Sequence, residues 1–450
     1  MPRNFLTLSW LGLVVLPTLA AAAPLRLDEA VQRALAHSPE LRAASRQTQA
    51  ARARANASQV LFRPQVDVRY MARRSDNPLD AFADKLNTRS VTSTDLAPAT
   101  INEPATSTVH ATQLSVELPL YTGGRIGAQT RAASSYAQAA RLAYEHRRLT
   151  TIYNTIHAYR AAQAGAHGMV IADDAVEAAR EHAATTARLA RQGRIANSDR
   201  MTAELNLASV ESLREQAAHR QRLAHDELWR VLGMPADAEL ILPPWESPTT
   251  PTVNSAPTDS ERRALSGRKD LQAQAAVLAA SRNKIGAARA VFQPQVSVVA
   301  TNSWYDDNAA LDNKSQSVMG VVSMNLFNGG RDWHGLTAAQ HETAESELRL
   351  EAMQESIRSE VRAAASRLTE ATARRRIAAQ GIDKARETVR LVKHRYGEGR
   401  TILIDLLMSE RVLVEARNEE LTAGLNQELS AAQLQLAEGT LALPGESSAH

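Results

Sequence analysis

Polar and apolar residues alternate in four short stretches of the chain, whereas elsewhere apolar residues recur at the three- and four-residue spacings of helices. The alternating stretches span about 65–74, 110–121, 295–305 and 316–327. In the first of them, Val66 and Val68 point to one face, and Asp67 and Arg69 point to the other. Such alternation is typical of a transmembrane β-strand, although an exposed hairpin of a soluble protein gives the same pattern.

Long helical patterns follow each pair of predicted strands. We expect helices at about 124–192, 198–232, 330–396 and 401–441. The first contains no proline and would be roughly 100 Å long at a rise of about 1.5 Å per residue. The third has apolar residues at the spacing of a coiled-coil seam, namely Met353, Ile357, Val361, Ala364 and Leu368. Helices of this length have to pack against other helices along their length.

The turns from strand to helix are duplicated. Tyr121-Thr-Gly-Gly-Arg125 recurs as Phe327-Asn-Gly-Gly-Arg331, at an offset of 331 − 125 = 206 positions. The same offset relates Gly193 to Gly399 and Asp199 to Asp405. A register kept over this distance indicates an internal repeat. Six residues are therefore expected to form the pivots between strand and helix: Gly123, Gly124, Arg125, Gly329, Gly330 and Arg331.

The repeat divides the chain into segments. Residues 1–23 resemble a secretory signal peptide, because Arg3 precedes a short apolar stretch that ends in Ala20–Ala23. The alternative, a transmembrane helix, would need a longer apolar stretch. We expect the two repeats at 24–240 and 258–442, a proline-rich linker at 241–257 and a disordered tail at 443–450.

Composition narrows the possible functions. The 450 residues are 44% hydrophobic but only 4% aromatic, and the abundance of alanine suits long helices. The net charge of +3 is small and the charges are interspersed, so we expect no nucleic-acid partner. Without cysteine there can be no disulfide, thiolate metal site or lipidated N-terminal cysteine. No motif of a nucleotide-binding, hydrolytic or zinc enzyme is present, so we expect no enzyme activity, cofactor or metal.

Aromatic residues mark the junctions between predicted helices and strands. These are Phe62, Tyr121, Phe292 and Phe327. Outer-membrane barrels carry aromatic girdles where the membrane meets water, so we expect these residues at the membrane interface. The alternative is that the four rings pack a local junction core.

The turns between the long helices are the remaining candidate site. Gly193 and Gly399 suit the ends of the outgoing helices, and Asn197 or Ser198 could cap one returning helix. Asp199 and Asp405 lie near the positive ends of the returning helices, where they could either compensate the helix dipole or close the tip of a duct.

Four strands cannot close a barrel, and unpaired strand edges are not viable in lipid. Bacterial barrels have at least about eight strands, so two copies of this chain would give eight and three would give twelve. The sequence therefore predicts a mixed α and β membrane protein that oligomerises, with a wet lumen and helices that project away from the membrane.

At this point the sequence resembles the TolC-type outer-membrane factors, the exit ducts of efflux pumps and type I secretion systems. The resemblance is carried by the ordered motifs Leu27-Asp-Glu-Ala-Val, the paired Phe-x-Pro-Gln-Val, the paired aromatic-x-Gly-Gly-Arg, and Tyr396 followed by Gly399 and Asp405-Leu-Leu. It covers essentially the whole chain after the signal peptide.

The resemblance implies a homotrimer with a twelve-stranded transmembrane β-barrel joined to a twelve-helix periplasmic α-barrel. It further implies location in the outer membrane of a Gram-negative bacterium, contact with outer-membrane lipid, and two protein partners, a periplasmic adaptor and an inner-membrane transporter. By motif position, Asp199, Tyr396 and Asp405 match residues that hold the periplasmic entrance shut. Thr401 and Met408 stand where the family pattern has an Arg and a further Asp.

One alternative from another class is a soluble periplasmic coiled-coil scaffold or adaptor. It would account for the signal peptide and the helices but not for four alternating strands with aromatic junctions. The sequence does not identify the cargo, nor does it distinguish efflux from type I secretion.

Overall fold

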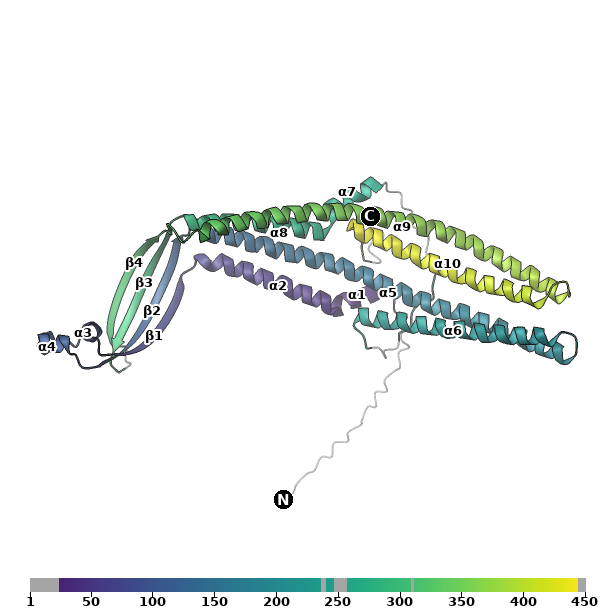
Figure 1. Cartoon of the computed structure of the whole chain (residues 1–450), viewed down its shortest axis with the longest axis horizontal. Helices are drawn as coiled ribbons and strands as arrows, with labels where there is room; N and C mark the ends of the chain where they lie inside the picture. The colour runs from purple at the N-terminus through teal and green to yellow at the C-terminus, as the bar shows by residue number, and fades with distance from the viewer. Residues whose placement is uncertain (1–23, 236–239, 247–256, 309–310, 444–450) are drawn as a thin grey trace, which may run out of the picture.

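A four-stranded antiparallel sheet forms one end of the molecule, and long helices extend from it (Figure 1). The computed structural model describes residues 24–235, 240–246, 257–308 and 311–443. The expected signal peptide therefore lies outside the described residues, as do most of the expected linker and nearly all of the expected tail. Within the described residues, no helix is both long enough and apolar enough to cross a membrane.

Eight helices come in matched pairs, one from each half of the chain, whereas two short helices at Pro78–Asn87 and Pro98–Asn102 have no counterpart among the described residues. The lengths of the matched helices agree pair by pair at 11, 21, 67 and 36 residues. The first half contributes α1 (Leu27–His37), α2 (Pro39–Gln59), α5 (Arg125–Arg191) and α6 (Asn197–Leu232). The second contributes α7 (Pro257–Gly267), α8 (Lys269–Arg289), α9 (Arg331–Gly397) and α10 (Leu403–Glu438). The duplication seen in the sequence is thus a duplication of structure.

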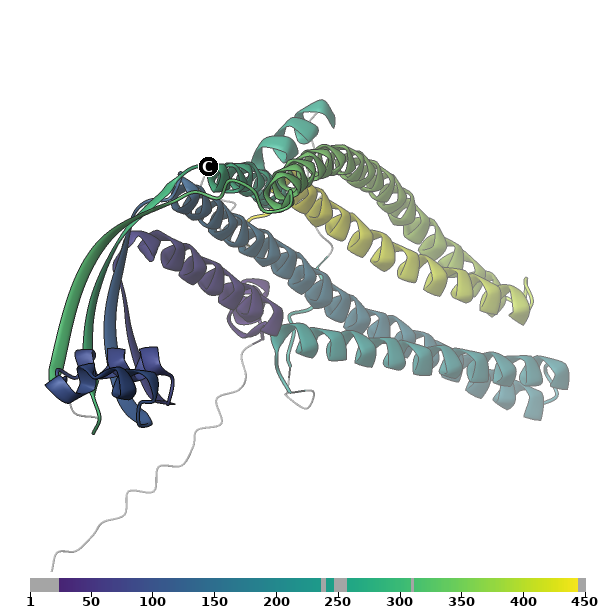
Figure 2. The same cartoon turned by 60° about the vertical axis from the view of Figure 1, so that its left-hand side comes forward.

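The strands follow one another in the sheet in chain order. They are β1 (Gln65–Ser75), β2 (Ser107–Tyr121), β3 (Gln295–Asp306) and β4 (Asn313–Ser323). Short 3-10 turns at Val60–Phe62 and Ala290–Phe292 end α2 and α8 and lead into β1 and β3. Figure 2 shows the sheet as a bowed layer, and we call the end remote from the long helices its outer end.

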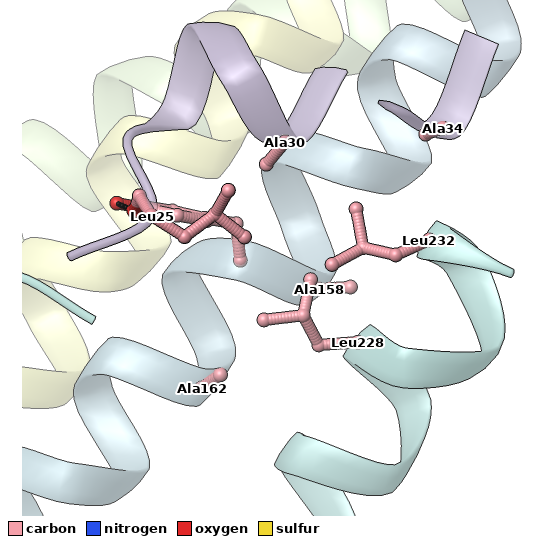
Figure 3. Close-up of a cluster of buried hydrophobic side chains, with 8 residues drawn as sticks. Leu25, Ala30, Ala34, Ala158, Ala162, Leu228 and Leu232 are labelled. Atoms are coloured by element: carbon pink, nitrogen blue, oxygen red, sulfur yellow. Dashed lines mark hydrogen bonds between the residues drawn. The ribbon is translucent and has the colours of Figure 1, made fainter. Parts of the chain in front are cut away.

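The packing along the helices is made mostly of small and aliphatic side chains. One cluster joins α1, α5 and α6 through buried residues shown in Figure 3, among them Ala30, Ala158, Leu228 and Leu232. There the hydroxyl of Tyr159 donates a hydrogen bond of 2.8 Å to the carbonyl oxygen of Leu25. A second cluster contains Ile357, Val361, Ala364 and Leu368 of α9, packed against α7, α8 and α10. The predicted seam of α9 is therefore confirmed.

Two predictions about element ends are wrong. The fourth strand was expected to reach residue 327 but ends at Ser323, because β3 begins at Gln295, which pairs with Ser323 and leaves no backbone partner on β3 beyond it. Neither Asn197 nor Ser198 caps α6; the helix starts at Asn197, and Ala196 occupies the cap position without a side-chain bond. The side-chain oxygen of Asn197 instead accepts a hydrogen bond of 2.9 Å from Nε of Arg200.

Consecutive glycines make the turn from strand to helix in both halves. Gly123 and Gly124 have φ angles of +63° and +83°, and Gly329 and Gly330 have φ angles of +72° and +88°. Side chains other than hydrogen are strained in this left-handed region. At Gly123 space is lacking as well, because an added Cβ would lie 2.5 Å from Cβ of Gln293 and 2.6 Å from the carbonyl oxygen of Ala290. At Gly329 no atom lies within 4 Å of such a Cβ.

This contrast gives a matched pair of substitutions. Gly123→Ala and Gly329→Ala should both lose about 1–2 kcal/mol from the left-handed backbone. Only Gly123→Ala should lose more, because Ala290 and Gln293 have to move. Thermal unfolding of the detergent-extracted protein, followed by circular dichroism, should give the lower midpoint for Gly123→Ala. Equal midpoints would show that the close approach at Gly123 relaxes without cost.

Candidate functional site

The sheet has one apolar and one polar face. In an antiparallel sheet, residues directly opposite each other on neighbouring strands point to the same side. One such row crosses all four strands with Val66, Val116, Ala300 and Val318. The next row points to the other side and consists of Asp67, Ser115, Thr301 and Ser317. The alternation predicted from sequence therefore separates a surface suited to lipid from a surface suited to water.

Both outer edges of the sheet lack a strand partner among the described residues. The order β1-β2-β3-β4 leaves one side of β1 and one side of β4 unpaired. Nearly all side chains of these edge strands are exposed, whereas those of β2 and β3 are mostly half-buried. The edges carry free backbone N–H and C=O groups, which a second chain can pair.

The four junction aromatics lie where the sheet meets the helices. All four are exposed, from 36% of its surface for Phe292 to 84% for Phe327. Phe292 packs edge-on against Trp333, with 6.4 Å between the ring centroids. One of the four rings thus contributes to a local junction contact, and the other three present apolar surface at the rim of the sheet.

The far ends of the helix hairpins are two turns of the same construction. Gly193 and Gly399 both have φ of +70°, and the turns they end are closed by backbone bonds from Arg194 to Leu189 and from Arg400 to Arg395, of 3.0 and 2.9 Å. This is the helix-ending arrangement in which glycine takes the left-handed position. Figure 1 shows both turns at the end of the molecule opposite the sheet.

Two of the predicted tip residues come together across the hairpins. Burial and the nearby negative charge of Asp199 both raise the pKa of Tyr396. Tyr396 also packs on a small cluster made by Ala183, Ala203, Leu403 and Leu407, so α5, α6, α9 and α10 meet there. Asp405 is exposed and accepts a hydrogen bond of 2.5 Å from the hydroxyl of Thr401 in its own turn.

A further link between the hairpins escaped the sequence analysis. Nε2 of His182 on α5 lies 2.7 Å from Oε1 of Glu410 on α10, and both side chains are largely buried. Arg417 of α10 similarly pairs with Asp174 of α5 at 3.1 Å. No local pattern marks these partners, because more than two hundred residues separate each pair along the chain.

Among the described residues, no group of three or more His, Cys, Asp or Glu side chains could hold a metal ion. The candidate site consists of the amphipathic sheet with its open edges and the two helix turns. The sheet is amphipathic and has open edges, and it is joined to helix pairs far longer than a globular core needs. These features are typical of the subunits of membrane channels that continue into a tube of helices.

The sequence profile of the outer membrane efflux protein family matches residues 30–234 and 262–440, and the chain belongs to this family. No curated protein gives a significant sequence match. The chain is thus an outer-membrane protein with its long helices in the periplasm, and the soluble scaffold is not favoured.

Solved structures share the fold over nearly the whole chain. The CmeC outer membrane channel of Campylobacter jejuni is 17% identical, with 92% of this chain and 85% of that chain covered and a TM-score of 0.77. The outer membrane protein VceC of Vibrio cholerae is 19% identical, with coverage of 92% and 96% and a TM-score of 0.76. The open state of the MtrE outer membrane channel of Neisseria gonorrhoeae is 18% identical, with coverage of 93% and 90% and a TM-score of 0.76.

Proposed function

We propose that three copies of this chain form a passive exit duct, a twelve-stranded β-barrel in the outer membrane joined to a twelve-helix tunnel in the periplasm. The observation that carries the proposal is the pair of unpaired edges on a sheet whose two faces differ in polarity. In lipid these edges require partner strands, which further copies of the chain supply. Two copies would give eight strands and satisfy the edges equally well, so the choice of three rests on the family resemblance.

The duct serves a tripartite efflux pump or a type I secretion system. A periplasmic adaptor and an inner-membrane transporter are the proposed partners, and the transporter supplies the energy. Conduction itself needs no reacting group in this chain, since the polar sheet face offers a continuous wet surface from β1 to β4.

Within this duct the two helix turns form the periplasmic entrance. The proposed tip residues are Gly193, Asp199, Tyr396, Gly399 and Asp405. The charge of Asp199 contributes to the raised pKa of Tyr396, and Asp405 is exposed in the first turn of α10, which supports this assignment. The entrance opens when the adaptor moves the hairpins apart. The proposed membrane interface at the other end of the helices is marked by the four exposed junction aromatics Phe62, Tyr121, Phe292 and Phe327.

The lipid-facing register is tested by a charge on the apolar face. Val116→Arg should lower the yield of trimers, because a buried arginine in the lipid-facing band costs up to about 2–4 kcal/mol. The matched control is Ser115→Arg, one residue earlier on the polar face, which should assemble normally. Trimer yield is measured by native mass after detergent extraction. Normal assembly of Val116→Arg would show that the register has been assigned to the wrong face.

The tip is tested by removing its two acids. Asp199→Ala combined with Asp405→Ala should raise single-channel conductance in planar bilayers if these carboxylates close the entrance. Asp383→Ala is the control, since this exposed acid lies on α9 roughly 20 Å from the turn at about 1.5 Å per residue. If the conductance equals that of the unaltered trimer, the two acids do not close the entrance, and their role is limited to compensating the helix dipoles.

A further inference from the structure

The segment between β1 and β2 is folded, although no helix was expected there from the sequence. It contains α3 (Pro78–Asn87), a 3-10 turn (Ser93–Leu96) and α4 (Pro98–Asn102). Asn77 caps α3 by accepting hydrogen bonds of 3.0 and 3.4 Å from the backbone of Leu79 and Asp80. We call residues 76–106 the strap. Both views place it at the outer end of the sheet (Figures 1 and 2).

The strap is anchored to the polar face of the sheet. Arg73 follows Asp67 and Arg69 in register and so points to that face. It donates a hydrogen bond of 2.8 Å to Asp80 and forms a second ion pair with Asp84. Two serines bind the same carboxylates and are themselves paired across β1 and β2, with Ser75 at 3.0 Å from Asp80 and Ser107 at 2.8 Å from Asp84. Both carboxylates of α3 are therefore held by groups of the polar side.

The strap also covers and crosses the sheet. Val109 and Ala111 share the polar side with Arg73 and are only 6% and 8% exposed, and α3 packs against their strand. Beyond α3, the guanidinium group of Arg89 donates a hydrogen bond of 3.0 Å to the carbonyl oxygen of Lys314 on β4. Arg89 adopts φ of +55°, which is uncommon outside glycine, at the turn that ends α3, where the backbone N–H of Ser90 donates a hydrogen bond of 2.9 Å to the carbonyl oxygen of Lys85. The strap thus reaches from β1 to the opposite edge strand.

Internal charge pairs keep the strap folded. Lys85 forms an ion pair with Asp95, whose other oxygen accepts hydrogen bonds of 2.8 Å from the backbone and the hydroxyl of Thr92. These bonds, led by that from Lys85, lower the pKa of Asp95 to about 2. A lowered carboxyl pKa contributes stability above the ordinary pKa and loses it only as the pH falls toward 2. The strap should therefore keep its fold at neutral and mildly acidic pH.

The strap has an acidic excess. Residues 76–106 contain five acids and two bases, a net charge of 2 − 5 = −3, which becomes −2 when Arg73, the partner of Asp80 and Asp84, is counted. The acids are Asp76, Asp80, Asp84, Asp95 and Glu103, and the bases are Lys85 and Arg89. Rings of carboxylates in a pore favour cations over anions.

We propose that the strap projects into the lumen at the outer mouth of the duct, narrows the exit, and makes it selective for cationic over anionic cargo. This inference rests on the proposed function, because the polar face lines a lumen only if the sheet closes into a barrel. Given that closure, a segment bonded to the polar face lies inside the barrel wall. Three copies place three acidic straps around one opening.

The experiment replaces residues 77–105 by a short Gly/Ser turn in trimers that carry Asp199→Ala and Asp405→Ala, so that the periplasmic entrance does not limit the current. Single-channel conductance should rise severalfold in potassium chloride. The reversal potential in a salt gradient should shift toward that of a non-selective pore. Trimer yield should stay unchanged, because the strap lies outside the lipid-facing band.

A milder variant keeps the chain length intact. Arg73→Gln removes the two anchoring ion pairs and should also raise conductance, with larger current fluctuations. Arg74→Gln is the matched control, since Arg74 is the next residue, points to the opposite face, and pairs in register with Thr108. Its channels should match the parent.

The outcomes separate the two proposals. Trimers of the deletion and of Arg73→Gln that keep the parent's conductance and reversal potential would overturn the role of the strap and leave the duct intact. Parent molecules that form no channel, even with both tip acids removed, would overturn the duct and the strap together. A severalfold rise in the deletion and in Arg73→Gln, but not in Arg74→Gln, supports the strap as the exit constriction.

Discussion

Backbone hydrogen bonding at the two edges of the sheet constrains everything else in this molecule. In water an unpaired strand edge is tolerable, but in hydrocarbon each unsatisfied N–H or C=O group costs several kcal/mol. The strands β1 and β4 each have one such edge, and their side chains are exposed on both faces. A single copy is therefore incomplete as a membrane protein. In the proposed duct, the requirement for partner strands would fix the copies around a common axis, and the helices that leave the same sheet would then be gathered around that axis too.

Long helices of this composition depend on close approach rather than on large apolar side chains. Eleven of the nineteen buried residues of α5 are alanine or threonine, and larger residues such as Tyr159 and Ile152 occupy the other eight positions. Small side chains allow helix axes to come close, and many weak dispersion contacts then add up along 67 residues. The polar links between hairpins, such as His182 with Glu410, fix which residues face each other. Helices packed in this way can separate between hairpins while each helix stays intact.

The sequence predicted those features that depend on a pattern of residues close together in the chain. Alternation located the strands, glycine pairs located the pivots, and the seam of Ile357, Val361 and Leu368 is buried as predicted. Prediction failed where the partner is distant. The end of β4 is set by where β3 begins, and the His182–Glu410 contact joins residues 228 positions apart. The strap was missed despite a local signal, because Asn77 followed by Pro78 is a normal helix start but the surrounding polar residues suggested a loop.

In the proposed duct, different interactions hold the periplasmic entrance and the outer exit. At the helix turns, Tyr396 of α9 packs on side chains of α5, α6 and α10, and the charge of Asp199 on α6 raises its pKa, so movement of one hairpin against the other would change these interactions. At the outer end, Asp80 and Asp84 are bound to Arg73, Ser75 and Ser107, which belong to strands adjacent to the strap itself. Those bonds lie within one hairpin of the sheet and do not depend on how the helices are arranged. In the proposed duct, an adaptor acting on the helices would therefore open the entrance without altering the exit, and the proposed selectivity of the exit would belong to this chain and not to its partners.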